Sequence, residues 1–313
     1  MLISSETSLY DNSSLKSLMN NAGCQFELYR PTTCMKRVIS VFTLSAIISC
    51  LYAGVFILGS GKKKKSGNFQ ELLNTRSRVN SSLNAILVFV LASMSFFKDG
   101  SRLLDNPLHT YSNYVFITSC CLFAYTLVDS AVVLVLLRNC KSEQRLEHYC
   151  YLAHHILTIY MAMIVSIYDY LPFFAGLRLL SEFSTPFINI RWYALKSGLY
   201  DTLAFYILHS LTFIAFCLCR LLPIIPFWLW LFQAVAVRSI PTSGLNVVDR
   251  FVRVVNSATR DNQIKPYMKL HFEIMVVCCL TLDVLNCIWA ARLFNLTYLY
   301  WKKQINQIMK KQN

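Results

Sequence analysis

Two adjacent histidines, His154 and His155, are the residues of this chain whose types and setting best suit chemistry. They lie in an apolar run, Tyr149 to Tyr168, long enough for a membrane-spanning helix. An imidazole facing the interior of a helical bundle could act as a general base toward a hydroxyl or amine substrate. Asp129 and Glu182, in other apolar runs, could orient that base. These four residues are the candidate catalytic set, and composition alone favours the alternative of structural core histidines.

The spacing of the two histidines argues against a metal site. Neighbouring residues on a helix point about 100° apart, so the two rings cannot easily share one ion. A helical zinc site needs a second histidine or an acid one turn away, and positions 158 and 159 hold Thr158 and Ile159. We therefore predict no bound metal.

Further polar residues lie inside apolar runs, where an ionisable side chain costs about 2.5–3.5 kcal/mol on insertion scales. Arg178 and Glu182 are four residues apart, so they are predicted to share a helix face and to pair. Asp283 and Asn286 are three apart and could bridge helices through hydrogen bonds. Asp129 needs a partner from another helix, either a protonated histidine or Arg178.

The elements that must position these residues are transmembrane helices. Of the 313 residues, 55% are hydrophobic and 15% charged, whereas soluble domains carry about 25% charged residues. The apolar residues form long runs, so we expect an all-α membrane protein, a bundle of about seven transmembrane helices. The predicted spans are 38–60, 83–97, 114–137, 149–168, 173–190, 202–222 and 270–294. The 14-residue run 224–237 suits a re-entrant or interfacial segment better.

The spans divide the chain into one bundle with flanking segments. A polar tail covers residues 1–37, an anchor helix 38–60, a basic loop 61–80, the bundle 81–300 and a tail 301–313. A basic insert within the bundle, 238–269, has one apolar helical face and one charged face. Such a helix lies on the membrane surface or packs on the bundle. The formal charge of +14 lies between and beside apolar runs, which indicates membrane surfaces rather than nucleic acid.

The orientation follows from the basic loops and two short signals. The loop from Lys62 to Arg78 is predicted to be cytoplasmic, which puts the N-terminus in the lumen and, after seven crossings, the C-terminus in the cytoplasm. Asn12 begins a glycosylation sequon in the lumenal tail. Lys310 and Lys311 resemble a dilysine signal for retrieval to the endoplasmic reticulum. The basic insert disagrees, because seven crossings make it lumenal.

The spans around the histidine pair resemble the TLC domain, named from TRAM, LAG and CLN proteins. The chain reads His154-His155-Ile156-Leu157 and then R-L-L-S-E-F-S-T-P-F-I-N-I-R-W from Arg178 to Trp192. Leu127-Val128-Asp129-Ser130 is similar to the family's earlier acidic helix, and the run Leu282 to Trp289 to its last helix.

The resemblance implies a lipid-facing cavity and a role in membrane lipid composition. Ceramide synthases of this family combine the histidine pair with a downstream His-Asp element. That element is absent here, where the helix carries Ser181, Glu182 and Asn189. The side chains that the resemblance places around a lipid cavity are Arg178, Asn189, Arg191, Trp192, Asp283 and Asn286.

Three functions therefore stay open. The first is a lipid-binding protein of the endoplasmic reticulum membrane, with membrane lipids as partners and no cofactor. The second is an acyltransferase with acyl-CoA as co-substrate. The third is a membrane cargo or chaperone adaptor that uses the insert 238–269 as its recognition surface.

Overall fold

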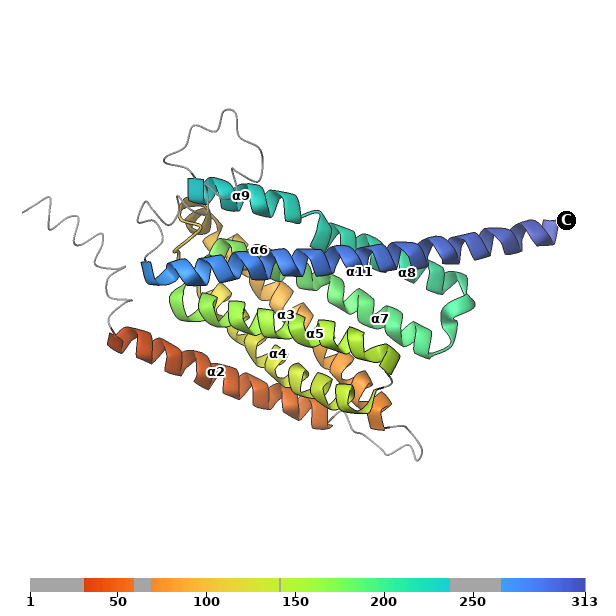
Figure 1. The fold of residues 1–313 in the computed structure, drawn as a ribbon, viewed down its shortest axis with the longest axis horizontal. Coiled ribbons are helices and arrows are strands. Elements are labelled where there is room, and N and C mark those ends of the chain that lie inside the picture. Colours follow the sequence, from red (N-terminus) through yellow and green to blue (C-terminus); the bar gives the residue numbers. More distant parts are fainter. Residues whose placement is uncertain (1–30, 59–68, 141, 237–265, 313) are drawn as a thin grey trace, which may run out of the picture.

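The computed structural model describes residues 31–58, 69–140, 142–236 and 266–312 (Figure 1). These residues form helices joined by short turns, and no strand occurs among them. The expected all-α architecture is confirmed. The tail through residue 30, the loop 59–68 and most of the insert 238–269 lie outside the described residues, and so does Asn12.

The helices run side by side and reverse direction at each turn (Figure 1). The first four passes are single helices: α2 (Pro31–Leu58), α3 (Phe69–Asp105), α4 (Asn113–Asn139) and α5 (Ser142–Tyr168). The fifth pass combines α6 (Pro172–Leu180), η1 (Ser181–Ser184) and α7 (Thr185–Lys196). After the short turn η2 (Leu199–Asp201), the sixth pass combines α8 (Leu203–Phe216), η3 (Cys217–Leu221) and α9 (Ile224–Ala236). The last pass is α11 (Pro266–Gln312).

Six segments of the described chain are long and apolar enough to cross a membrane. The α6–η1–α7 stretch adds a further pass along the bundle, but it is not one unbroken helix. Pro186 explains the break, because its ring lacks an N–H and clashes with the carbonyl four residues earlier in a continuous helix. The chain tightens into the 3₁₀ turn of η1 at that point, and α7 then starts with the proline in its first turn.

The structure corrects the prediction for residues 224–237. Residues 224–236 form α9, which continues α8 through the π-helical turn η3, and Leu203–Ala234 is one 32-residue span rather than a span and a separate short segment. The amide of Leu222 bonds the carbonyl of Cys217 at 2.9 Å, five residues back. Pro223, which has no N–H to donate, follows directly.

Several turns are shorter than the sequence indicated. Residues 69–80 and 99–105, expected in loops, belong to α3, and residues 301–312 continue α11 as helix. The chain reverses between α5 and α6 in a tight turn at Asp169–Leu171. Asp169 and Leu171 have φ of 48° and 56°, in the left-handed region.

Burial differs strongly between passes. Within their most apolar windows, 61% of α4 residues are buried inside the protein but only 17% of those in the first span, Lys36–Gly54. Helix α4 is therefore the central element, packed by α3 and α5. Helix α2 lies at the periphery, as Figure 1 also shows.

Candidate functional site

Asp129 on α4 and His155 on α5 form a buried pair. His155 Nε2 lies 3.5 Å from Asp129 Oδ2. The Ser77 hydroxyl from α3 donates to Asp129 Oδ1 at 2.5 Å, and Ser130 Oγ lies 3.3 Å from His155 Nδ1. The interhelical partner that Asp129 requires is thus a histidine, the first of the two predicted alternatives.

Polar groups lie on both sides of the His155 ring. Ser130 Oγ, which also lies 2.6 Å from the Thr126 carbonyl, faces Nδ1, and the Asp129 carboxylate faces Nε2. Whether Ser130 donates to the ring or accepts from it depends on the tautomer. With its proton on Nε2, a neutral His155 faces the carboxylate with a donor.

His154 turns to a different neighbour, as the 100° offset predicts. Its ring lies 5.8 Å from Trp289 of α11, edge to face, and 5.9 Å from the His155 ring. The buried Nδ1 of His154 has no hydrogen-bond partner among the described residues. Within the described ranges no cluster of three or more metal-ligating side chains occurs.

Arg178 pairs with Asp283, and the predicted pairing with Glu182 is wrong. Two guanidinium nitrogens bond the two Asp283 oxygens at 2.5 and 2.8 Å, and Trp228 Nε1 donates to the same carboxylate at 2.9 Å. The guanidinium also covers the ring of Phe227 at 3.9 Å. The helix ends between Arg178 and Glu182, so the one-turn relation on which the prediction rested does not exist.

Glu182 instead lies 3.6 Å from Arg220, a buried residue of the π turn that the sequence analysis did not single out. Arg220 Nε donates to Ser184 Oγ at 2.8 Å, and its two terminal nitrogens reach Thr185 Oγ1 at 3.1 Å and Asn286 Oδ1 at 3.5 Å. The missed signal was a lone arginine inside an apolar run. π turns are themselves frequent at functional sites.

Asn189, Arg191 and Trp192 connect α7 to other helices. Asn189 Nδ2 donates to the Arg78 carbonyl at 3.1 Å and to Ser82 Oγ at 2.9 Å. Trp192 lies under the Arg78 guanidinium, 4.6 Å from it. Arg191 Nε donates to a ring nitrogen of His209 on α8.

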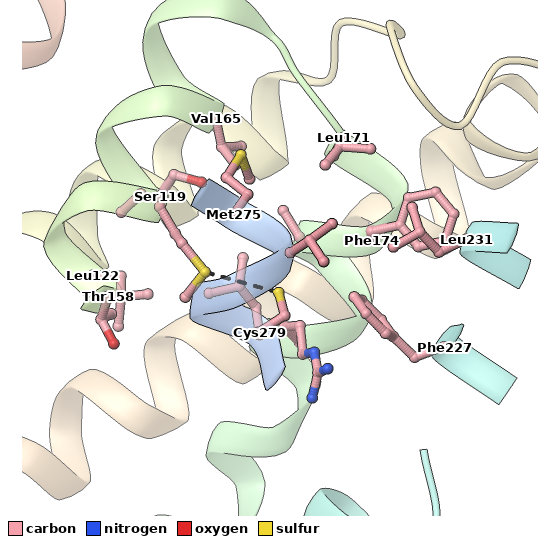
Figure 2. A pocket seen from close by; sticks show the side chains of 16 residues that line it. Ser119, Leu122, Thr158, Val165, Leu171, Phe174, Phe227, Leu231, Met275 and Cys279 are labelled. Carbon is pink, nitrogen blue, oxygen red and sulfur yellow. Dashed lines mark hydrogen bonds between the residues drawn. The ribbon is translucent and has the colours of Figure 1, made fainter. Parts of the chain in front are cut away.

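A cavity of about 80 Å³ lies between α4, α5, α6, α9 and α11 (Figure 2). Its wall is almost wholly apolar, and the side chains seen around it include Leu122, Val165, Phe174, Phe227, Leu231 and Met275. Arg178 is the single predicted lipid-contacting residue in this wall, and Asn189, Arg191, Trp192, Asp283 and Asn286 lie outside it. Neither histidine lines the cavity, although Thr158, one turn after His154, does.

Comparison with known proteins assigns the family. The model of the TLC domain, named for TRAM, LAG1 and CLN8, matches residues 74–295. TLC domain-containing protein 4-B of Danio rerio is 24% identical over 249 residues, which covers 77% of this chain and 79% of the relative. The protein of the same name from Xenopus laevis is 42% identical over 43 residues, 14% of this chain and 16% of its own length. No solved structure matches. Because the matched region includes the histidine pair and the Arg178–Trp192 motif, and most of the chain, this multi-pass membrane protein belongs to the TLC domain family.

Proposed function

We propose that the protein binds a lipid within its helical bundle and thereby acts in membrane lipid homeostasis in the endoplasmic reticulum. The observation that carries this proposal is the apolar cavity between α4, α5, α6, α9 and α11. Small-molecule sites are concave, mostly apolar and supported by a few placed polar groups. The polar side chains in the wall are Ser119, Thr158 and Arg178, and Asp283 holds Arg178 from outside it.

The lining of the cavity suits a short segment of a hydrocarbon chain. The charge of Arg178 is neutralised by Asp283 and covered by Phe227, so the wall offers an acyl chain contacts with Leu, Met and Phe side chains. An acyl chain that enters from the bilayer leaves an equally apolar medium. Its binding free energy therefore comes from packing contacts in the cavity and not from the hydrophobic effect. Binding should therefore depend on the shape of the cavity.

The test is to fill the cavity. Ala175 lines it, and Ala175→Leu would occupy part of its volume; Ala131→Leu, on the exposed face of α4, is the matched control. Both variants and the wild type would be purified in mild detergent and their bound lipids quantified by mass spectrometry. Loss of lipid in Ala175→Leu with retention in Ala131→Leu is expected. Equal lipid in all three proteins would overturn the proposal.

The compartment and orientation rest on the two terminal signals. We expect a lumenal N-terminus and a cytoplasmic C-terminus, so Asn12 should carry a glycan and Lys310 with Lys311 should retain the protein in the endoplasmic reticulum. Asn12→Gln should remove a glycosidase-sensitive mobility shift. A double change of the lysines to serine should send the protein to later compartments.

Acyl transfer is the second candidate, and the buried Asp129–His155 pair favours it, because a carboxylate beside an imidazole can orient it as a base. Acyl-CoA would be the co-substrate, and a histidine would take the proton from the attacking hydroxyl or amine. The test adds acyl-CoA to purified wild type, His154→Ala and His155→Ala. A new acylated lipid that forms with wild type and vanishes in either variant would establish the enzyme. Absence of product together with unchanged cell lipids in both variants would leave the histidines structural.

A further inference from the structure

Five arginines of the bundle fall into two groups by their partners. In the first group each guanidinium meets a carboxylate: Arg37 meets Asp169, Arg178 meets Asp283 and Arg220 meets Glu182. Arg78 of α3 and Arg191 of α7 form the second group. Neither has a carboxylate within ion-pair distance in the part of the chain that the structure describes.

Arg78 contacts neutral side chains of α7. Its Nη1 donates to the side-chain oxygen of Asn189 at 3.2 Å, and its guanidinium lies 4.6 Å from the ring of Trp192. The buried Nε of Arg78 has no hydrogen-bond partner among the described residues. A guanidinium presents five donors, so this one retains unused capacity for an acceptor.

Arg191 also has a neutral partner. Its Nε donates to His209 Nδ1, which must therefore be unprotonated. The other ring nitrogen of His209 lies 3.3 Å from the carbonyl of Leu293 and is placed to donate. His209 is thus the neutral tautomer with the proton on Nε2, and it cannot balance the charge of Arg191.

The two arginines lie on packed helices, α3 and α7. Arg78 contacts Asn189 and Trp192, which lie on either side of Arg191 in the sequence of α7. Lys196 adds a third positive charge 5.7 Å from the Trp192 ring, although it also meets Glu71 at the surface at 3.2 Å. Charges away from bulk water are normally paired, and like charges in a low-dielectric setting are costly. Among the described residues, Arg78 and Arg191 have no carboxylate within ion-pair distance. The acids nearby are Glu71, which meets Lys196, and Glu147, which interacts with Tyr151 beside Arg78.

We propose that Arg78 and Arg191, with Lys196 at the rim and Trp192 beneath, form a binding site for a phosphate group carried by an amphiphile. Arginine forks bind phosphate oxygens with paired hydrogen bonds, and Nε is the Arg78 donor that has no partner among the described residues. This inference rests on the proposed lipid-binding function and names the head-group chemistry that accompanies the chain in the cavity.

The location suits a head group. Arg191 lies five residues before the end of α7 at Lys196, about 7.5 Å along the helix axis. Tryptophan is enriched at that depth, where the bilayer meets water. A phospholipid phosphate can reach this level from the bilayer, and the phosphates of coenzyme A or free phosphate can reach it from water.

The experiment uses the full-length protein in phosphatidylcholine nanodiscs. One set of nanodiscs contains a small share of phosphatidic acid, and a control set contains oleic acid, an anionic lipid without phosphorus. Native mass spectrometry would count the lipid bound to wild type, Arg78→Gln, Arg191→Gln and Arg102→Gln. The last variant removes an exposed arginine of α3 near Asp99 and is the charge-matched control. Wild type and Arg102→Gln should enrich phosphatidic acid about tenfold more than the other two variants, the effect expected when a charge-assisted bond is lost.

Parallel titrations with coenzyme A and with inorganic phosphate, followed by calorimetry, identify the source of the phosphate. Binding of either probe that depends on Arg78 and Arg191 also supports the site. Should the glutamine variants fail to fold, Arg78→Lys and Arg191→Lys keep the charge but not the fork, and intermediate binding is expected. Equal binding in Arg78→Gln and Arg102→Gln, or enrichment of oleic acid as strong as that of phosphatidic acid, would overturn the site. When one of these results overturns the phosphate site but Ala175→Leu still loses lipid, the proposed lipid-binding function stands and only this inference has failed. When phosphate binding depends on Arg78 and Arg191 but no lipid occupies the cavity, the proposed function has failed and the phosphate site stands.

Discussion

Arg37 on α2 clasps Asp169 in the turn between α5 and α6. Arg37 Nη2 donates to the carboxylate, and Nε donates to the Ser166 carbonyl at 2.9 Å. Helix α2 lies outside the region matched by the TLC domain, while Leu171, two residues beyond Asp169, lies in the cavity wall. The clasp therefore ties a helix outside the domain to a left-handed turn that shapes the cavity.

Arg37→Gln should destabilise the protein. Both side chains are largely buried, with 15% and 11% of their surfaces exposed, so the change leaves a carboxylate without its counter-charge. We expect a loss of about 2–3 kcal/mol, toward the lower end for a broken buried pair. Thermal unfolding of Arg37→Gln, Asp169→Asn and the double variant would give the coupling energy. Additive effects of the two changes would show that the clasp contributes nothing.

The same turn should make stability depend on pH. Burial raises the pKa of Asp169 from 3.8 to about 6, and the nearby Arg37 only partly offsets that effect. Because the folded-state pKa is the higher one, Asp169 favours the folded state below about pH 4, and this contribution is lost as the pH rises through 6. The difference between wild type and Asp169→Asn should change by at most about 3 kcal/mol across this range. Unfolding midpoints at several pH values would measure it, and a constant difference would contradict the assignment.

The sequence predicted the helices well because membrane spans are long and their composition is extreme. It also located several of the buried polar residues, among them Asp129, His155 and Asp283, since a charge within an apolar run is conspicuous. It could not predict their partners. The pairing expected for Arg178 and Glu182 assumed a continuous helix, and the 3₁₀ turn at Ser181–Ser184 turns the two side chains toward α11 and η3 instead.

Arg220 and the Arg78–Arg191 cluster show a second limit. Their roles depend on contacts between passes that are far apart in sequence, such as Arg220 with Asn286 or Arg78 with Asn189. Spacing along one helix contains no information about such contacts. The same holds for the cavity, whose wall combines five helices.

Asp283→Asn should destabilise the wall of the cavity. Arg178 would keep its charge beside an apolar space and lose both charge-assisted bonds, so we expect a loss of about 3 kcal/mol. Glu273→Gln, ten residues earlier on α11, is the control, because Glu273 makes no ion pair among the described residues. Replacing both partners, as Arg178→Met with Asp283→Leu, should recover much of the stability. No recovery in the double variant would mean that Asp283 acts through contacts other than Arg178.

Arg220→Lys should loosen the junction between the two broken passes. The guanidinium reaches Ser184, Thr185 and Asn286 at once, and these contacts hold the 3₁₀ turn of one pass against the π turn of the next. A single ammonium cannot reproduce that fork, so we expect a loss of about 2–3 kcal/mol although the charge is kept. Arg292→Lys, at an exposed position of α11, should change stability by less than about 0.5 kcal/mol. Hydrogen exchange would locate the effect, since the amides of 181–185 should lose protection in Arg220→Lys while those of α4 keep theirs. Unchanged protection at that turn would show that Pro186 alone maintains the break.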